Sequence, residues 1–181
     1  MWQPRLCRRA SSYTSIAHCI RQNYEGDWSV IPLRSPAGEI HPGRMINADR
    51  DACAFVATPY LERCPYFRQV LDSFRCPLRV VRLMRLIPGS IIKEHTDLDL
   101  SFENGMVGIH IPIATNDAGK FQLNRSVVLE AGSAWYLRLS DPHSVANRGS
   151  TDRVHMVFDA NVNDWVKALF ESAMAQAGAE A

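Results

Sequence analysis

The sequence lacks three features that would place it in a specialised class of protein. No apolar run approaches the roughly 20 residues that a membrane-spanning helix requires. There is no internal repeat and no low-complexity tract, which excludes solenoids and disordered linkers. The net charge is only +1, so no overall field attracts nucleic acid or an anionic membrane. These absences leave an ordinary globular domain and disfavour nucleic acid or an anionic membrane as its partner.

Cysteine is present but is not arranged for disulfides or for a zinc site. The five cysteines are odd in number, and none has the CxxC spacing of a structural zinc site. We therefore expect reduced, mostly buried thiols in a reducing compartment, the cytoplasm. The residues concerned are Cys7, Cys19, Cys53, Cys64 and Cys76.

Size and composition predict one folded domain. The chain has 181 residues, of which 46% are hydrophobic and 22% charged, and this composition supports a single core. We place the domain at residues 24–181 and an N-terminal extension at residues 1–23. The extension carries four arginines and no acid before Glu25, as transit peptides do. No clear amphipathic stripe accompanies the arginines, so a plain extension leading into a short helix is favoured, and a targeting segment is the alternative.

Apolar periodicity predicts an all-β core. From residue 78 onward, short apolar or β-branched runs alternate with turn residues, a spacing typical of sandwiches and of the jelly rolls that house cupin-type sites. Helical spacing predicts one helix over residues 60–74 and a terminal helix beginning near Trp165. We expect strands at 28–33, 78–87, 90–92, 108–113, 121–123, 126–129, 134–139 and 153–159.

His95 and Asp97 could share one metal ion. They follow the predicted strand at 90–92, and residues i and i+2 of an extended backbone point to the same face. An imidazole and a carboxylate placed in this way can reach one ion. Taken alone the pair is a weak signal, because such a spacing on a surface turn is more often a solvated pair.

His143 and Arg153 complete a set of residues with a known chemistry. His143 follows a predicted apolar strand and a polar turn, and Arg153 opens the last predicted strand ten residues later. Two His and one carboxylate on one face of a metal form the facial triad of non-haem Fe(II) oxygenases. An Arg on a neighbouring strand can hold a dicarboxylate co-substrate through two parallel hydrogen bonds. His95, Asp97, His143 and Arg153 supply these parts in order.

With these residues in view, the chain resembles the aspartyl/asparaginyl β-hydroxylase family of Fe(II)/2-oxoglutarate-dependent oxygenases, which includes bacterial proline hydroxylases. The resemblance covers roughly residues 24–166 and is strongest from Arg82 to Trp165. It is carried by Arg82-Leu83-Met84-Arg85-Leu86, His95-Thr96-Asp97, Ile109-His110-Ile111-Pro112-Ile113, Gly132-Ser133-Ala134-Trp135-Tyr136-Leu137, Pro142-His143 and Asp152-Arg153-Val154-His155.

The resemblance implies a fold, a metal site and a co-substrate site. The implied fold is mainly β, a double-stranded β-helix (jelly-roll, cupin-like) core with flanking helices. The implied catalytic metal is Fe(II) at His95, Asp97 and His143, with O₂ as oxidant and 2-oxoglutarate held by Arg153 with help from His110. Arg34 is similar to an Arg at the corresponding place in small-molecule hydroxylases of this group, and the resemblance implies that it holds the substrate carboxylate; a surface arginine is the alternative.

Several positions admit two interpretations. Many family members have an Arg two residues before the equivalent of His110, where this chain has Gly108; either 2-oxoglutarate is held by fewer contacts or that Arg served the substrate. His110 itself would otherwise be typical of a core histidine. Arg82 and Arg85 are three residues apart in a strand, so at most one faces the site. For His155 a supporting role is favoured over a catalytic one.

The expected function is hydroxylation of an unactivated C–H bond in an amino acid or another small carboxylate-bearing molecule, with conversion of 2-oxoglutarate to succinate and CO₂. The sequence does not indicate an oligomeric state. Two alternatives stay open: a metal-dependent cupin enzyme that does not use 2-oxoglutarate, and a non-catalytic cupin-like binding module. Succinate formation would argue against the first, and failure to bind Fe(II) would favour the second.

Overall fold

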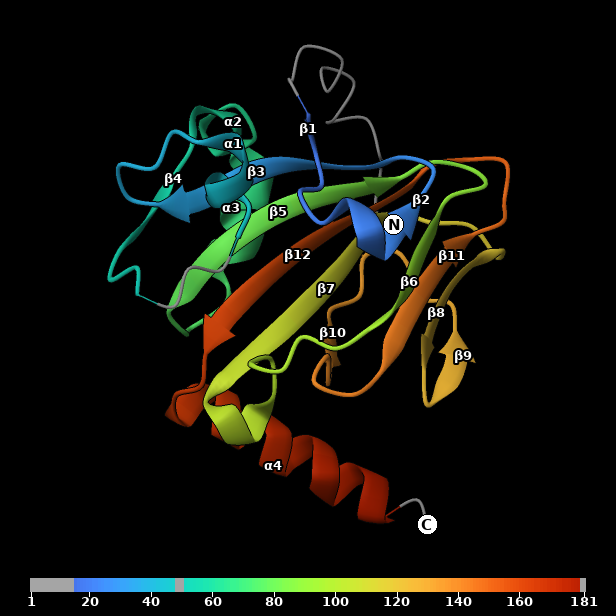
Figure 1. The fold of residues 1–181 in the computed structure, drawn as a ribbon. Coiled ribbons are helices and arrows are strands. Elements are labelled where there is room, and N and C mark those ends of the chain that lie inside the picture. Colours follow the sequence, from blue (N-terminus) through green and yellow to red (C-terminus); the bar gives the residue numbers. More distant parts are fainter. Residues whose placement is uncertain (1–14, 48–50, 180–181) are drawn as a thin grey trace.

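The structure is a computed structural model, which describes residues 15–47 and 51–179. Two antiparallel sheets form the body of the molecule (Figure 1). The strands of the described residues are β1 (Ile16–Ala17), β2 (Tyr24–Glu25), β3 (Trp28–Pro36), β4 (Phe55–Ala57), β5 (Leu78–Leu86), β6 (Ile91–His95), β7 (Met106–Ala114), β8 (Gly119–Leu123), β9 (Arg125–Val127), β10 (Trp135–Leu137), β11 (His143–Asn147) and β12 (Arg153–Asn161).

The strand order is that of a double-stranded β-helix. The larger sheet runs β1-β3-β5-β12-β7-β10, with β4 paired to β3, and the smaller sheet runs β2-β6-β11-β8-β9. Consecutive strands from β5 to β8 alternate between the two sheets, with β5 and β7 in the larger sheet and β6 and β8 in the smaller one. The predicted mainly β jelly-roll class with flanking helices is confirmed.

The helices flank the larger sheet, and one of them departs from the sequence-based prediction. Instead of one helix over residues 60–74 there are two, because Pro65 has no N–H to donate and forces Cys64 out of the helical region, at φ −123° and ψ 72°. Figure 1 shows α1 to α3 beside β3 and β4, and α4 at the opposite end. The helices are α1 (Pro42–Met45), α2 (Pro59–Glu62), α3 (Pro65–Asp72) and α4 (Asp164–Ala179), with 3₁₀ turns η3 (Arg21–Asn23) and η4 (Phe102–Asn104).

Four strands of the described residues were not expected from the sequence: β1, β2, β4 and β11. β11 is short and polar, and it becomes a strand because β6 and β8 flank it on both sides and complete its hydrogen bonds. β1 lies within the predicted N-terminal extension, where Ile16 pairs with Val30 of β3. The division of the chain at residue 24 stays a prediction.

The larger sheet separates two apolar clusters. One lies between that sheet and the helices, where Phe67 and Leu71 of α3 and Val166 of α4 pack against the outward-facing side chains of the strands. The other lies between the two sheets and includes Phe121 and Val145 of the smaller one. The space left between the sheets beside this second cluster is where the polar residues of the core gather.

The four cysteines of the described residues are free thiols, which confirms the absence of disulfides among them. The expectation that they are mostly buried was wrong: Cys19 and Cys53 are exposed, and Cys64 and Cys76 are only partly buried. Each lies in a loop or at a helix end rather than in a strand, where the sheet core would have covered it. Cys7 falls outside the described residues. No helix in residues 15–47 and 51–179 is long and apolar enough to span a bilayer.

Phe158 tests the cluster under the helices. It is fully buried on the outer face of β12, and its ring meets that of Phe74 edge-on at 4.9 Å between centroids. We expect Phe158→Ala to lower the free energy of unfolding by about 3–5 kcal/mol, because it leaves a cavity in a packed core. The control is Leu169→Ala at a 49% exposed position, which should change it by less than about 0.5 kcal/mol. Equal effects in urea denaturation would contradict this packing.

His18 fixes β1 to the sheet and generates a prediction about acid stability. Its ring stacks on Trp28 at 3.5 Å between centroids, and burial, with smaller effects of Arg82 and His95, lowers the pKa of His18 to about 4. Between that value and its ordinary pKa of about 6.5, the unfolded chain binds a proton that the folded chain does not. The contribution of His18 to stability is therefore present at neutral pH and is lost as the pH falls.

We expect His18→Phe, which keeps a ring on Trp28 but cannot titrate, to weaken the dependence of stability on pH between neutral pH and about 4. Urea denaturation of both proteins across this window gives the two slopes. Identical slopes would mean that the buried ring does not titrate as inferred.

Candidate metal and co-substrate site

β12 presents polar side chains to the space between the sheets. Alternate residues of a strand point to opposite faces. On one face Met156, Phe158 and Ala160 join the cluster under the helices. The other face carries Arg153, His155, Val157 and Asp159, all of them buried. A row of charged and titratable groups is thus enclosed in the interior, at a cost in solvation that each must offset by a partner.

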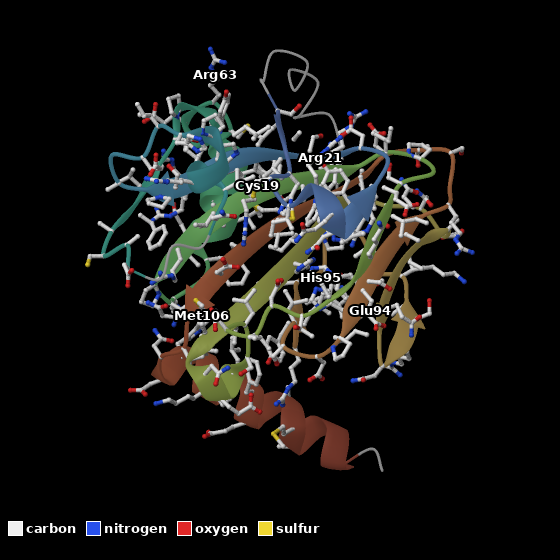
Figure 2. The ribbon with its side chains drawn as sticks, in the orientation of Figure 1. Cys19, Arg21, Arg63, Glu94, His95 and Met106 are labelled. Atoms are coloured by element: carbon white, nitrogen blue, oxygen red, sulfur yellow. The ribbon has the colours of Figure 1, made fainter. Side chains whose placement is uncertain are left out.

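His95, Asp97 and His143 meet opposite this row. His95 is the last residue of β6 and His143 the first of β11, and the two are cross-strand partners with ring centroids 4.3 Å apart (His95 is labelled in Figure 2). Asp97 lies just beyond β6, where its backbone N–H donates to the carbonyl of Leu139 at 2.8 Å. One ligand atom of each of the three residues lies within 4.8 Å of the others, close enough to hold one metal ion.

Both imidazoles are oriented as metal ligands are. Nδ1 of His95 donates to the carbonyl of Lys93 at 2.8 Å, and Nδ1 of His143 donates to the carbonyl of Asp141 at 3.0 Å. With the proton on Nδ1, the Nε2 lone pair of each ring is free for a metal. Burial, with a smaller effect of the neighbouring His95, lowers the pKa of His143, although the hydrogen bond to the carbonyl of Asp141 and the charge of Asp97 oppose the shift. The lowered pKa favours the neutral form of the ring.

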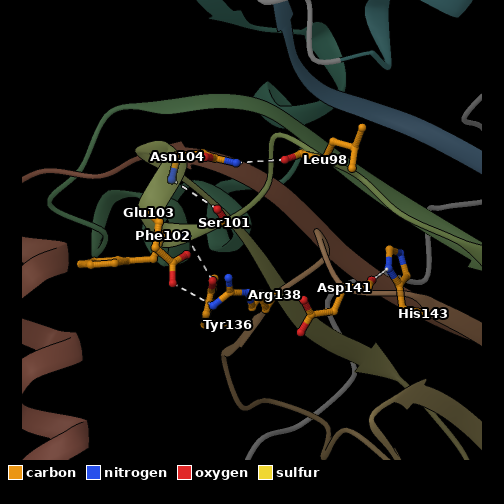
Figure 3. A network of polar contacts seen from close by, with 9 residues as sticks. All are labelled: Leu98, Ser101, Phe102, Glu103, Asn104, Tyr136, Arg138, Asp141 and His143. Carbon is orange, nitrogen blue, oxygen red and sulfur yellow. Dashed lines mark hydrogen bonds and ion pairs between the residues drawn. The ribbon is translucent and has the colours of Figure 1, made fainter.

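A polar network holds the segments that carry Asp97 and His143 together (Figure 3). Arg138, just before the second segment, donates to Glu103 at 2.7 Å and forms an ion pair with Asp141 at 3.4 Å. The carbonyl of Asp141 in turn accepts from His143. These exposed contacts are individually weak, but they connect the loop after Asp97 to the loop before His143. The two loops are thereby positioned relative to each other.

A cavity of about 240 Å³ joins the cluster of His95, Asp97 and His143 to the polar face of β12. It is smaller than the roughly 300–1,000 Å³ of sites for drug-sized ligands, so it suits small molecules. The structure brings together, in its lining, His95, Asp97, His143, Arg153 and His110.

Arg153 is a buried cation without a counter-ion. Its residue is 4% exposed, and among the described residues no acidic side chain pairs with it. One Nη2 hydrogen bond goes to the neutral Nδ1 of His155 at 3.2 Å, and Nε has no partner. Burial lowers the pKa of Arg153 to about 9, which still leaves the group charged at neutral pH. An anion entering the cavity would supply the missing partner.

His110 lies in the middle of the same wall with both ring nitrogens unpaired. It is 7% exposed, and neither Nδ1 nor Nε2 has a hydrogen-bond partner. Burial, followed by the positive charge of Arg153, lowers the pKa of His110 well below its usual value, so the ring is neutral. A core histidine satisfied by the protein would have a partner, whereas one donor and one acceptor of the His110 ring are left without one.

Arg34 is the one predicted site residue that lies elsewhere. It belongs to β3 and is not part of the cavity lining. Its Nη2 donates to the backbone carbonyl of Phe55 at 2.7 Å and, more weakly, to that of Leu78 at 3.5 Å. The structure therefore gives it contacts within the protein in place of a position facing the cavity.

Three cavity residues had no assigned role in the sequence-based prediction. Arg82 lines the cavity while Arg85 pairs with Asp152 on the exposed side, which confirms that only one of the two faces the site. Asp159 was visible as an acid in phase with Arg153 in an apolar strand, a signal of a buried charge that could have been used. His18 carried no such signal, because it lies in a segment that was treated as an extension.

The chain is similar to known proteins in sequence and in structure. L-proline cis-4-hydroxylase of Rhizobium meliloti (strain 1021) is 25% identical over 137 residues, which are 74% of this chain and 48% of that protein; the chain thus spans about half the length of this relative. A crystal structure of a 2OG-Fe(II) oxygenase family oxidoreductase from Burkholderia pseudomallei matches at a TM-score of 0.53 and 16% identity, over 85% of this chain and 77% of the other. A crystal structure of a Pseudomonas putida prolyl-4-hydroxylase matches at a TM-score of 0.49 and 16% identity, over 87% of this chain and 82% of the other.

The structural likenesses, at such low identity, concern the fold alone. The sequence comparison goes further, because the profile of one family matches residues 15–162, from β1 through the last strand. That span includes His95, Asp97 and His143 as well as His110 and Arg153. The chain belongs to the aspartyl/asparaginyl β-hydroxylase family.

Proposed function

We propose that this protein is an Fe(II)- and 2-oxoglutarate-dependent hydroxylase of an unactivated C–H bond in an amino acid or another small carboxylate-bearing molecule. One observation carries the proposal: the buried guanidinium of Arg153, which has no acidic counter-ion among the described residues, shares a small cavity with a His, Asp, His cluster. The cluster alone would suit many metal enzymes. The enclosed cation adds a requirement for an acidic co-substrate.

The donor set fits Fe(II). Two imidazoles and one carboxylate that occupy one side of an ion leave its other positions open to a co-substrate and to O₂. His95, Asp97 and His143 would hold the metal, with both Nδ1 protons already engaged by backbone carbonyls. Mn, Co, Ni or Zn could occupy the same ligands in purified protein, since affinity follows the Irving–Williams order.

The unpaired groups of the wall fit 2-oxoglutarate. A planar guanidinium can donate two parallel hydrogen bonds to the distal carboxylate, and Arg153 is held in place by His155. His110 would contribute its unpaired ring to the same molecule. With the metal bound, Fe(II), 2-oxoglutarate and O₂ supply the oxidising power for hydroxylation, while succinate and CO₂ are released.

The protein itself positions the substrate and encloses the reacting groups. Aromatic and aliphatic side chains of the smaller sheet, including Phe121 stacked on His143 at 5.7 Å between centroids, keep water from the reacting groups. The size of the cavity favours a small substrate. The named activity of the Rhizobium relative, hydroxylation of L-proline, supports an amino acid as the first candidate. We assign no substrate contact to Arg34, because it does not line the cavity.

The free thiols of the described residues support the predicted cytoplasmic location.

The metal site is tested by removing one ligand. His143→Ala should weaken Mn(II) binding by more than about 100-fold, because a missing ligand costs more than the roughly 10–100-fold seen for its supporting contacts. Calorimetric titration measures the affinity, and circular dichroism establishes that the variant is folded. His41→Ala, at an exposed histidine outside the cavity, is the matched control. Retained affinity in folded His143→Ala would remove the metal site from this position.

The co-substrate site is tested at Arg153. We expect Arg153→Lys to weaken 2-oxoglutarate binding to the metal-loaded protein by about tenfold and Arg153→Ala by up to about 100-fold, since Lys keeps the charge but loses the fork. Mn(II) affinity should change little, because Arg153 is not a ligand.

Arg85→Lys provides the control on the exposed side of the neighbouring strand. Unchanged 2-oxoglutarate affinity in a folded Arg153→Ala protein would favour a metal-dependent cupin enzyme that does not use this co-substrate. Loss of Mn(II) binding as well would point to general damage in that variant.

A further inference from the structure

Asn147, the last residue of β11, is a fully buried amide that the proposed metal and co-substrate sites do not use. Its Nδ2 donates to the carbonyl of Leu86 at 2.9 Å and to that of Thr151 at 2.8 Å. Its Oδ1 accepts from Nδ2 of Asn116 at 3.1 Å and from the backbone N–H of Gly149 at 3.2 Å. Both donors and both acceptor positions of the amide are thus filled. Such a buried, fully satisfied group fixes the segments that it contacts.

These contacts join the two sheets. β11 belongs to the smaller sheet, whereas Leu86 ends β5 of the larger one. Residues 148–152 carry the chain across from β11 to β12 (Figure 1), and two of the four side-chain bonds go to this loop. The backbone of Asn147 adds two bonds to the turn after β5. Its N–H donates to the carbonyl of Ser90 at 3.0 Å, and its carbonyl accepts from the N–H of Gly89 at 2.8 Å.

Asn147 lies between the two groups that are proposed to hold 2-oxoglutarate. β11 begins with His143, a proposed metal ligand, and ends with Asn147. Arg153 begins β12, and its cross-strand partner is Leu86, whose carbonyl accepts from Asn147. His143 and Arg153 therefore belong to different sheets, which Asn147 connects at the level of Arg153. The distance from the metal to the guanidinium depends on this connection.

The loop before Arg153 is held by amides rather than by apolar packing. Residues 148–152 include no apolar side chain that could anchor them in the core. Asn116 adds two bonds to those of Asn147, since its Nδ2 donates to the carbonyl of Thr151 at 3.1 Å and to its Oγ1 at 3.3 Å. A side chain at Gly149 would displace Asn116, because an added Cβ would lie 2.1 Å from its Oδ1. The two amides thus fix the backbone that leads into β12.

A co-substrate that bridges the metal and Arg153 must match the distance between them. A guanidinium fork accepts a carboxylate well only over a narrow range of positions, and a binding site must be held to within about 0.5 Å of its best geometry. The side chain of Arg153 is restrained by a single bond, from Nη2 to His155. The backbone before Arg153 therefore decides where the fork lies.

We propose that Asn147 is a positioning residue that sets the distance between the metal and Arg153, and that it thereby selects the chain length of the 2-oxo dicarboxylate. This inference rests on the proposed function and deepens it, because it assigns the determinant of co-substrate length. Asn147 is not part of the cavity lining, so it acts through the end of β5 and the loop before β12. Asn116 supports it from the turn before β8.

The test compares three 2-oxo acids by calorimetric titration of protein loaded with Mn(II). 2-Oxoglutarate can reach both anchors, 2-oxoadipate is longer by one methylene, and 2-oxobutyrate has no distal carboxylate. We expect wild-type protein to bind 2-oxoglutarate at least about tenfold more tightly than 2-oxoadipate, since one methylene changes binding in a fitted pocket by about tenfold or more. Equal binding of these two acids by wild-type protein would overturn the proposal.

Asn147→Ala should weaken 2-oxoglutarate binding by about tenfold and reduce the preference over 2-oxoadipate to about threefold or less. The affinities for 2-oxobutyrate and for Mn(II) should stay within about twofold, because the metal end is unchanged. A merely structural role would lower stability without changing the preference. Asn163→Ala is the matched control, since Asn163 bonds the carbonyl of Arg75 and the N–H of Val166 outside the cavity.

Two milder variants keep the proposal open to disproof if Asn147→Ala does not fold. Asn116→Ala removes one bond to Asn147 and those to Thr151, and Gly149→Ala displaces the same Asn116 side chain. We expect both to reduce the preference for 2-oxoglutarate over 2-oxoadipate by about threefold. An unchanged preference in both folded variants would overturn the proposal.

The three acids separate failure of this inference from failure of the proposed function. An equal loss of affinity for 2-oxoglutarate and 2-oxobutyrate in folded Asn147→Ala would place the effect at the metal end and overturn the inference. Unchanged 2-oxoglutarate affinity in that variant would also overturn it. If wild-type protein does not bind 2-oxoglutarate in the presence of Mn(II), the proposed function itself fails, and this inference fails with it.

Discussion

Arg153 buries its guanidinium with no carboxylate partner among the described residues, and the interior between the two sheets is organised around that charge. A protein interior tolerates an isolated charge poorly, at a cost of several kcal/mol. His155 relieves only part of this through a single hydrogen bond, and His110 nearby adds two unpaired nitrogens. The cavity is therefore pre-formed for an anion, and burial makes each bond to that anion stronger than it would be at the surface.

The fold explains how so polar an interior is built. β12 separates its side chains by strand alternation, with its apolar residues beneath the helices and its charged residues toward the smaller sheet. The smaller sheet brings His95 and His143 together as cross-strand partners, so the backbone fixes the distance between the two imidazoles. Asp97 joins them from a loop that is hydrogen-bonded to the segment before His143. Positions set by regular backbone vary little, which suits a metal site.

Much of this site could be predicted from the sequence because its residues occupy strand ends in a fixed order. The strand runs were visible as apolar repeats, and the spacing around His95, His143 and Arg153 indicated the chemistry. Other features depend on tertiary contacts that a sequence does not display. β11 is a strand because its neighbours pair with it, and the Arg82–Asp159 ion pair joins residues 77 positions apart. Arg34 shows the converse, since a charged residue near the expected place turned out to bond backbone carbonyls outside the cavity.

In the proposed function the metal and the buried guanidinium of Arg153 bind one molecule between them. Anaerobic calorimetric titration of wild-type protein with 2-oxoglutarate, with and without Mn(II), tests this most directly. If the metal and Arg153 both contact 2-oxoglutarate, the protein should bind one equivalent of it in the presence of metal. In the absence of metal its affinity for 2-oxoglutarate should be at least about tenfold lower. Binding that does not depend on metal, or no binding at all, would contradict it.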